Sequence, residues 1–483
     1  MRVPATAAAP AWGAVPASRD AGGSRERIRA ARSRVPRRTV VLDDDPTGSQ
    51  SVHGLQVVTR LEAAEYRSAM ADDADGSFVL TNSRSLPRTA AETLTAAVAD
   101  DLFAIAHDRG VRLELVSRSD STLRGHVIAE VRALDEARRR ALGSGYDAVL
   151  LAPAFLEAGR VTAGDVHWAR VGGEFLPVGE TEFARDASFG YAASDLREFV
   201  AERSGGEIAA SDVGSIGLAD IREGGPERVA QVLQGTRGSQ FVVVNALDYA
   251  DLETVVLGAL TAEEHGLRLL YRTGPSFVRA LLGQEPLPPL TTAQIWPAAK
   301  AGGHGLIVVG SHVGQTGRQL AALARRGGLA EVELDVPELL GLDDAGAAGL
   351  VRRTADQVTN LLSGSDVVLY TSRALVAGDS GAESLAISRR VSAAVSAVVS
   401  ESLAARPAWV LAKGGITSHD VALHGLSIRR AEVVGQFFPG MVSLFRPVAA
   451  DPRVLGRPYV VFAGNVGDDS ALAEVVTTLR GGR

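Results

Sequence analysis

The sequence predicts an α/β protein of two domains, each a mostly parallel sheet flanked by helices. The chain has 483 residues, more than a single hydrophobic core usually serves. From Thr39 onward, short apolar runs typical of buried strands alternate with longer amphipathic stretches typical of helices. A segment rich in proline and glycine, residues 283–305, interrupts this alternation and divides the chain.

In the first half, strands are expected where β-branched residues cluster, and helices where apolar residues recur every three or four positions. Val127, Val131 and Leu134, for example, keep one face of a predicted helix apolar. The predicted helices are 61–68, 88–109 and 127–142. The predicted strands are 38–43, 55–59, 77–81, 112–117 and 146–152, then 240–245 and 267–271 after a less regular part from 161 to about 217.

The second half repeats the alternation. Its predicted strands are 306–310, 330–334, 366–370, 408–411 and 459–463, and a long helix is expected over 383–405. The domain boundaries that follow are a disordered leader at 1–38, a first domain at 39–282, a linker at 283–305 and a second domain at 306–483. The leader is assigned because alanine, proline, glycine and arginine dominate it without any sustained period.

The composition excludes several classes of function. The net charge of −7 argues against a nucleic-acid partner, which needs a basic surface. The chain has no cysteine, which excludes disulfides, thiolate catalysis and cysteine-ligated metals, and the histidine spacing suggests no metal site. The absence of cysteine suits a reducing cytoplasm, where we expect the protein, and no apolar run reaches the roughly 18–20 residues that span a membrane, so we expect no membrane partner.

Three consecutive acids, Asp43, Asp44 and Asp45, follow the first predicted strand and lead into a Pro-Thr-Gly turn. In open α/β sheets ligands bind outside the carboxyl ends of strands, so these carboxylates are expected to face a ligand. Adjacent carboxylates repel one another unless water, a cation or ligand hydroxyls meet them. A solvated acidic turn is the alternative interpretation.

A second polar loop follows a strand and runs directly into a helix. Ser121 and Thr122 in this loop are candidates to cap the helix. An anion above them would meet unpaired backbone N–H groups and the guanidinium of Arg124. In the alternative interpretation Asp120 and Ser121 only cap the helix, and Arg124 is solvated.

The charged side chains of these strand-end loops suggest how a small polar ligand could be held. Arg84, which follows another strand, and Arg124 could clamp a carboxylate. Asp44, Asp45 and Asp120 could accept hydrogen bonds from hydroxyl groups. A fourth loop ends in Arg160, which is either a further ligand contact or an exposed turn residue.

The second half contains three glycine-rich turns between a strand and a helix, at residues 408–418, 308–317 and 461–467. Missing Cβ atoms let a phosphate approach the backbone, and N–H groups at a helix start point toward it. Glycines also serve plain turns, and neither the Walker phosphate loop nor a clean Gly-x-Gly-x-x-Gly pattern occurs. A nucleotide would therefore be held by some other device.

Taken together, these motifs resemble the four-carbon acid sugar kinase family, whose members join an acid-sugar-binding domain to a nucleotide-binding domain. The resemblance covers nearly all of the chain after the leader, and its most specific element is the unchanged loop Asp-Ser-Thr-Leu-Arg-Gly at 120–125. The other matching motifs are Asp-Asp-x-Thr-Gly at 44–48, Ser-Arg at 83–84, Pro-Ala-Phe at 153–155 with Gly-Arg at 159–160, Gly-Ser at 310–311, Gly-Gly-x-Thr at 414–417 and Gly464. The chain departs from the family at Arg118, near where many members carry lysine, and at residues 49–53.

The resemblance implies ATP-dependent phosphorylation of a hydroxyl on a tetronate-type acid (D-threonate, D-erythronate or an oxo-tetronate), in an active-site cleft between the domains. One of Asp44, Asp45 and Asp120 would act as the base. The expected substrate contacts are Asp44, Asp45, Arg84, Asp120, Ser121, Thr122, Leu123, Arg124 and Arg160. The expected ATP contacts are Ser311, Gly414, Gly415, Ile416, Thr417 and Gly464. Mg²⁺ would be carried largely by the phosphates, with no protein ligand assigned and with Lys413 as a candidate to offset their charge.

Two other functions stay open from the sequence. The chain could be a kinase for a different small hydroxy acid or sugar, because the departure at residues 49–53 bears on substrate identity more than on reaction type. It could instead be a non-catalytic sensor of the same fold that binds a sugar acid and a nucleotide. The expected partners are therefore small molecules, and a homo-oligomer is allowed.

Overall fold

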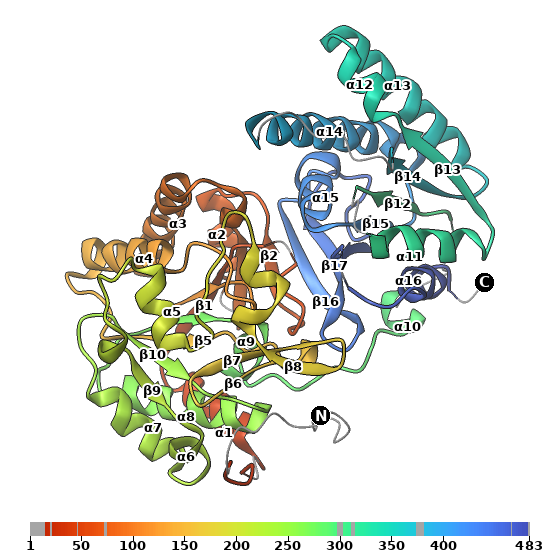
Figure 1. Ribbon diagram of the computed structural model, residues 1–483. Helices are drawn as coiled ribbons and strands as arrows, with labels where there is room; N and C mark the ends of the chain where they lie inside the picture. Colours follow the sequence, from red (N-terminus) through yellow and green to blue (C-terminus); the bar gives the residue numbers. More distant parts are fainter. Residues whose placement is uncertain are drawn as a thin grey trace. The chain divides into compact units, whose positions relative to one another are not determined.

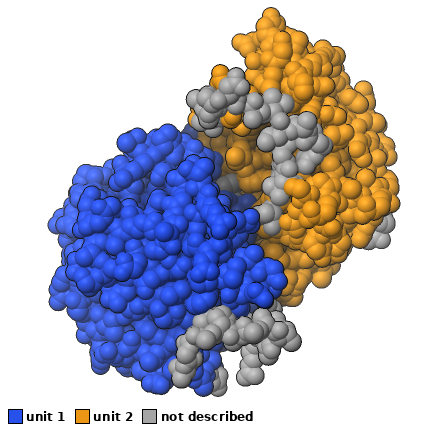
Figure 2. All heavy atoms as spheres, viewed as in Figure 1, with its two compact units in different colours: residues 1–52, 61–286 blue, residues 53–60, 287–483 orange. Residues whose placement is uncertain are grey.

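The computed structural model describes residues 15–19, 22–45, 47–71, 75–296, 303–310, 314–372, 381–464 and 466–481. The chain separates into two compact units: residues 1–52 and 61–286 form unit 1, and residues 53–60 and 287–483 form unit 2 (Figure 2). Each unit has its own strands and helices (Figure 1). The prediction of two α/β domains is confirmed; the chain enters unit 2 for residues 53–60, returns to unit 1, and passes to unit 2 again after residue 286.

Unit 1 is organised around a parallel sheet. Its strands, in spatial order, are β3 (Gly76–Leu80), β1 (Arg37–Asp43), β4 (Arg112–Arg118), β11 (Leu269–Thr273), β5 (Ala148–Ala152), β10 (Gln240–Val244) and β9 (Gly214–Ile216). The central strands are buried almost throughout, as their continuous apolar runs predict.

Helices cover both faces of this sheet, as the parallel arrangement requires. Two of them, α3 (Arg88–Arg109) and α4 (Val127–Leu142), have the bounds that the apolar periodicity predicts. Helix α4 ends at Gly143, whose φ of 72° lets the chain leave the helix. The other helices are α2 (Ala63–Ala69), α5 (Leu196–Arg203), α6 (Leu218–Arg222), α7 (Gly225–Gln234), α8 (Tyr249–Glu264) and α9 (Pro275–Leu281).

Unit 1 differs from the sequence prediction in the expected leader and in the less regular part. Within the leader, α1 (Ser24–Ser33) is an ordered helix that packs against α8, with Ile28 fully buried. The apolar face of α1 is short and is flanked by arginines. Because arginine and alanine are frequent throughout this part of the sequence, their pattern did not indicate a helix. The less regular part contains a small antiparallel sheet of β6 (Arg160–Ala163), β7 (Val166–Val171) and β8 (Glu174–Pro177).

Unit 2 is built around a mixed sheet. Its strands, in spatial order, are β13 (Leu329–Leu334), β14 (Asp366–Thr371), β12 (Leu306–Val309), β15 (Val410–Lys413), β18 (Tyr459–Phe462), β17 (Met441–Ala449), β16 (Arg430–Phe438) and β2 (Gln56–Val58). The first five are parallel and the rest antiparallel. The helices are α10 (Thr292–Ile295), α11 (Gly314–Ala324), α12 (Val336–Gly341), α13 (Asp344–Leu361), α14 (Gly381–Ser402), α15 (Gly415–Asp420) and α16 (Ala471–Leu479).

Unit 2 also contains elements that the sequence reading missed or misplaced. The strand expected at 55–59 belongs to this unit, because β2 pairs with β16. The hairpin of β16 and β17 was not predicted, although Pro439-Gly440 between two apolar runs is a turn signal. Helix α10 lies in the predicted linker and buries Ile295 in the core of unit 2. No helix in the described ranges is long and apolar enough to cross a membrane.

Candidate functional site

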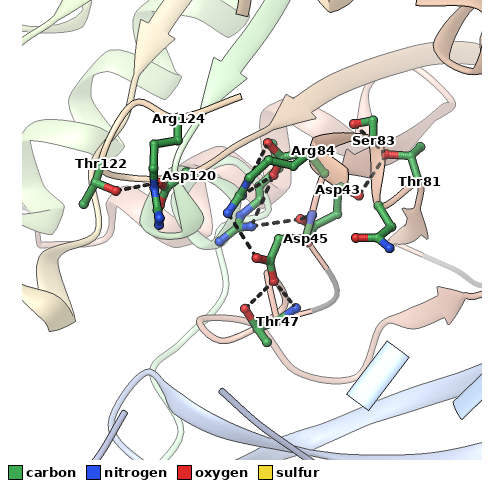
Figure 3. Close-up of polar contacts among 12 residues, drawn as sticks. Asp43, Asp45, Thr47, Thr81, Ser83, Arg84, Asp120, Thr122 and Arg124 are labelled. Carbon is green, nitrogen blue, oxygen red and sulfur yellow. Dashed lines mark hydrogen bonds and ion pairs between the residues drawn. The ribbon is translucent and has the colours of Figure 1, made fainter. Parts of the chain in front are cut away.

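The strands of unit 1 bring the polar loops of the first half together. Strand β1 pairs in parallel with β3 on one side and with β4 on the other, so their carboxyl ends lie at one edge of the sheet. The loops that leave these ends carry the acidic turn, Arg84 and residues 119–126. Figure 3 shows the side chains of these loops gathered in one place.

Two arginines, Arg118 at the end of β4 and Arg84 in the loop after β3, pair with the three consecutive aspartates. Oδ1 of Asp43 accepts a hydrogen bond from Nη1 of Arg118 at 2.9 Å. Both carboxylate oxygens of Asp44 accept from Arg84, at 2.6 and 3.2 Å. Asp45 accepts from Nη1 of Arg84 at 3.1 Å and from the turn that follows it. Two guanidinium groups thus offset the repulsion, and the turn is not merely solvated.

Burial and pairing set the charges of these carboxylates. Burial raises the pKa of Asp43 to about 7, although Arg118 opposes the shift. Burial also raises the pKa of Asp44 against the effect of Arg84, whereas in Asp45 the nearby guanidinium groups outweigh burial and lower the pKa. The Asp45 side chain is 26 % exposed and that of Asp44 only 2 %. Asp45 is therefore the acid of this turn that a ligand can reach.

The loop after β4 is held in one shape by its own side chains and by two neighbours. Oδ2 of Asp120 accepts from Nε of Arg124 at 2.6 Å and from the hydroxyl of Thr122. The backbone carbonyls of residues 121 and 122 accept from His167 and Tyr191, at 2.8 and 2.7 Å. Despite burial, the neighbouring guanidinium groups hold the pKa of Asp120 well below its usual value, so this carboxylate is ionised at neutral pH.

The expected helix cap is wrong. The N-cap position of α4 is His126, which makes no side-chain cap bond. Ser121 and Thr122 lie ahead of the helix because the chain first turns through Leu123 and Gly125 at positive φ, 68° and 116°. Glycine takes the second conformation without strain, and a Cβ there would lie 2.8 Å from a carboxylate oxygen of the acidic turn. The segment is a shaped loop whose side chains at 121–123 are buried.

Arg124 and Arg160 lie over the same aromatic ring. Each guanidinium is 5.7 Å from the ring centroid of Phe183. Arg124 also lies 3.6 Å from Asp186, and Arg160 donates to the carbonyl of Ala158 at 2.6 Å. Burial lowers the pKa of Arg160. The structure therefore gathers every site residue expected in the first half around one acid- and arginine-lined edge.

In unit 2, the strands that precede the glycine-rich turns are neighbours. Strands β12, β15 and β18 pair in parallel in that order, so the turns after them share one edge of the sheet. A Cβ on Gly310 would fall 2.4 Å from Oγ1 of Thr417, so only glycine fits there. The hydroxyl of Thr316 donates to the carbonyl of Gly464 at 3.1 Å. The predicted contact Ser311 lies outside the described residues.

The turn after β15 is built from backbone atoms. Gly414 has a φ of 123°, a conformation that L side chains rarely adopt, and leads into α15. A Cβ on Gly415 would meet nothing within 4 Å, and Ile416 is 62 % exposed. Two of the residues expected to contact a nucleotide, Gly415 and Ile416, therefore border open space.

Lys413 does not have the role that the sequence suggested. Its side chain is fully buried, and Nζ donates to the carbonyl of Ala463 at 2.8 Å and to that of Gly464 at 3.3 Å. The ammonium also lies 3.9 Å from the ring centroid of Phe462. Burial lowers the pKa of Lys413 to about 7. The residue fixes the loop after β18 and does not reach outward to a phosphate.

Comparison with known proteins assigns a different family to each half of the chain. Residues 39–281 match the sugar-binding N-terminal domain family, and residues 306–472 match the nucleotide-binding C-terminal domain family. The chain belongs to the family that joins these two domains. The acidic turn and the Asp120–Arg124 loop thus lie in the sugar-binding domain, and the glycine-rich turns lie in the nucleotide-binding domain.

Several solved structures share the fold. The Haemophilus influenzae protein HI1011, described as DUF1537, is 16% identical, with a TM-score of 0.60 over 91% of this chain and 100% of its own. A Salmonella typhimurium LT2 protein, provisionally described as a tRNA synthase, is 16% identical with a TM-score of 0.65 over 91% and 98%. A DUF1537 domain from Bordetella bronchiseptica, a domain-swapped dimer with bound citrate, is 24% identical over 92% and 98%, but its TM-score of 0.37 supports no conclusion for this chain. No curated protein matches the chain.

Sequence reasoning missed a charged layer beneath the acidic turn of the sugar-binding domain. Arg272, fully buried on β11, donates to Ser117 at 2.6 Å and to Glu130. Glu130 also accepts from the hydroxyl of Ser83, which precedes Arg84. A signal was present, since Arg272 interrupts an apolar strand and Glu130 lies on the apolar face of α4. Charges at such positions are rare unless they are paired.

Proposed function

We propose that this chain is an ATP-dependent kinase that phosphorylates a hydroxyl group of a four-carbon sugar acid of the tetronate type. The observation that carries the proposal is the cluster of aspartates and arginines at the carboxyl ends of β1, β3 and β4, within a sugar-binding domain. The same chain supplies a nucleotide-binding domain. Arginines suit a carboxylate and aspartates suit hydroxyl groups, which together describe a sugar acid.

In this proposal Arg84 and Arg124 bind the substrate carboxylate, and Arg160 adds positive charge beside them. Asp120 orients the attacking hydroxyl. Both oxygens of Asp44 and of Asp45 already accept hydrogen bonds, whereas the bonds to Asp120 from described residues all reach Oδ2. Oδ1 of Asp120 is therefore the acceptor best placed for a substrate hydroxyl. In a loose phosphoryl-transfer transition state, such orientation matters more than the strength of the base.

The nucleotide would lie against the glycine-rich turns, with Gly414, Gly415, Ile416, Thr417 and Gly464 as its contacts. The open space beside Gly415 leaves room for a phosphate group. Among the described residues, no group of three or more histidine and acidic side chains is arranged to hold a metal ion. Mg²⁺ would then arrive with ATP, bridging its phosphates and neutralising charge. The two domains would close on the ligands and exclude water from the transferring phosphoryl group.

A panel of acids tests this proposal. ATP consumption would be followed in a coupled assay with C4, C5 and C6 sugar acids and the matching neutral sugars, and the product would be identified by ³¹P NMR. We expect phosphorylation of a C4 acid, and loss of turnover with retained acid binding in Asp120→Asn. Activity only with a larger sugar acid or with a neutral sugar would show that the substrate is not a tetronate. Binding of ATP and acid without any turnover would favour a sensor over a kinase.

A further inference from the structure

The sugar-binding domain contains a cavity at the opposite end of its sheet from the acidic turn. Its volume is about 290 Å³, and it is lined by the amino-terminal ends of β4 and β11 and by the last turns of α3 and α4. Arg112 begins β4 and Arg118 ends it, so roughly 20 Å of extended strand separates the cavity from the acidic turn. The cavity is therefore distinct from the candidate sugar site.

Three arginines from different elements line this cavity: Arg112, Arg138 and Arg268. Their hydrogen bonds to the protein use only some of their nitrogens. Nη2 of Arg112 pairs with Glu263 at 2.9 Å, Nη1 of Arg138 donates to the turn after α4, and Nε and Nη2 of Arg268 donate to Asp147. A guanidinium has five N–H donors in a fork that matches a carboxylate, so each arginine retains donors for a ligand.

The charges around the cavity leave positive charge uncompensated. Two carboxylates line it, Glu114 and Glu263, but both already form ion pairs. Their partners are Arg32, Arg37 and Arg112. Burial, together with the charges of the two other lining arginines, lowers the pKa of Arg138. The exposed His107 at the rim adds no negative charge. Arg112 and Arg268 are paired with Glu263 and Asp147, so an anion in the cavity would chiefly compensate the guanidinium of Arg138.

The rest of the wall is apolar. Phe103 and Leu269 are buried in it, and Tyr146 lies beneath Arg138, whose guanidinium is 5.3 Å from the ring centroid. Leu142 stands at the rim with 54 % of its surface exposed. A wall of this kind favours a ligand with an apolar body, and the volume is close to the lower end of the range for small-molecule pockets.

We propose that this cavity is a second ligand site, which binds a small organic acid with its carboxylate on Arg112, Arg138 and Arg268 and its apolar body against Phe103, Tyr146 and Leu269. The ligand differs from a sugar acid, because Phe103, Tyr146 and Leu269 present an apolar surface and the two lining carboxylates are already engaged in ion pairs. The site does not depend on the kinase proposal, since it lies at the other end of the strands.

Benzoate is a suitable probe, and benzamide is its neutral control. Isothermal titration calorimetry of the full chain should show saturable benzoate binding, with benzamide at least about tenfold weaker because it lacks the charge. Leu142→Glu places a negative charge at the exposed rim and should weaken benzoate binding about fivefold or more. Val171→Glu adds the same charge at a 38 % exposed position on β7 and should leave the affinity unchanged. Arg138→Gln should also weaken binding, by about tenfold.

Three results would overturn the proposal. One is the absence of saturable benzoate binding at concentrations up to about 10 mM. The second is equal affinity for benzamide, which would remove the role of the arginines. The third is an equal response to Leu142→Glu and Val171→Glu, which would place the benzoate elsewhere. Because Leu142 is exposed, its variant reports on the cavity even if Arg138→Gln fails to fold.

Discussion

The two candidate sites of this chain occupy the same position in their sheets, the carboxyl ends of parallel strands, but they are built from different materials. The site of the sugar-binding domain is made of charged side chains, in the pairs Asp43–Arg118, Asp44–Arg84 and Asp120–Arg124. The site of the nucleotide-binding domain is made of glycines and backbone carbonyls, and its buried cation, Lys413, is already bonded to two of those carbonyls.

Because of this difference, we expect different kinds of substitution to impair ligand binding at the two sites. A site of paired charges is sensitive to the loss of a charge at constant size, because removing one partner leaves the other buried and unpaired. A site of bare backbone is insensitive to such changes but cannot accept an added side chain where a ligand must lie. Variants of each type therefore test whether the two sites differ in this way.

The largest effect is expected from Gly415→Asp in the nucleotide-binding domain. The new carboxylate would occupy the space proposed for the phosphates and repel them, so ATP affinity should fall by at least about 10³-fold in calorimetric titrations. Gly415→Ala is the matched control, since its Cβ would meet no protein atom within 4 Å and adds no charge, so its ATP affinity should fall much less than that of Gly415→Asp. Unchanged ATP affinity in Gly415→Asp would remove this turn from the site.

Arg84→Met should lower kcat/KM for the sugar acid by about 10³-fold, because two charge-assisted contacts worth about 1.5–3 kcal/mol each are lost. ATP affinity should not change. Arg84→Lys keeps the positive charge but not the two-pronged guanidinium that holds Asp44. Its kcat/KM should lie between those of the wild type and Arg84→Met. Arg67→Met, which breaks an exposed pair with Asp108, is the control and should retain full activity. Retained activity in Arg84→Met would contradict the charge-built site.

Arg124→Ala should raise KM for the acid by about 10²-fold with little change in kcat, because a contact to the carboxylate binds ground and transition states alike. Steady-state kinetics with saturating ATP measures both constants. Arg132→Ala removes an exposed arginine from the neighbouring helix α4 and should leave KM unchanged. Identical kinetics in Arg124→Ala and the wild type would dismiss Arg124 as a substrate contact.

The smallest effect is a pH dependence of opposite sign in the two domains. The pKa of Asp43 is raised to about 7 in the folded state, so the folded domain holds a proton that the unfolded chain releases near pH 4, and stability should fall from about pH 4 to 7. The pKa of Lys413 is lowered to about 7, so stability of its domain should rise from about pH 7 to 10. Each slope is at most about 1.4 kcal/mol per pH unit.

Hydrogen exchange followed by mass spectrometry resolves the two domains in one sample. Asp43→Asn should flatten the acid-side slope in the sugar-binding domain alone, and Lys413→Met should flatten the alkaline-side slope in the nucleotide-binding domain alone. A slope that survives its own variant would assign the titration to another group.

Much of the fold is readable from the sequence because its signals are local. Helices α3 and α4 have the predicted bounds, since α4 carries an amphipathic period and α3 is a long stretch of good helix formers that ends at Gly110. Helix α1 escaped notice because its buried face centres on the single residue Ile28 within an arginine-rich stretch. Strand β2 was assigned to the wrong domain because its partner, β16, lies more than 370 residues later, and no local signal encodes that pairing.

The candidate site was readable only in part, for a related reason. The residues at strand ends, such as Asp45, Arg84 and Asp120, could be found because parallel pairing brings strand ends together. Their partners could not: Glu130 and Arg272 meet beneath the turn only after α4 and β11 pack together. The role of Lys413 was misjudged because the carbonyls that hold it belong to another loop, 50 residues later.

A crystal structure with D-threonate and a non-hydrolysable ATP analogue would test the central claim most directly. We expect the acid carboxylate within hydrogen-bonding distance of Arg84 and Arg124, a hydroxyl on Asp120, and the phosphates over residues 414–417. An acid bound away from the Asp120–Arg124 loop, or a nucleotide away from the glycine-rich turns, would contradict it.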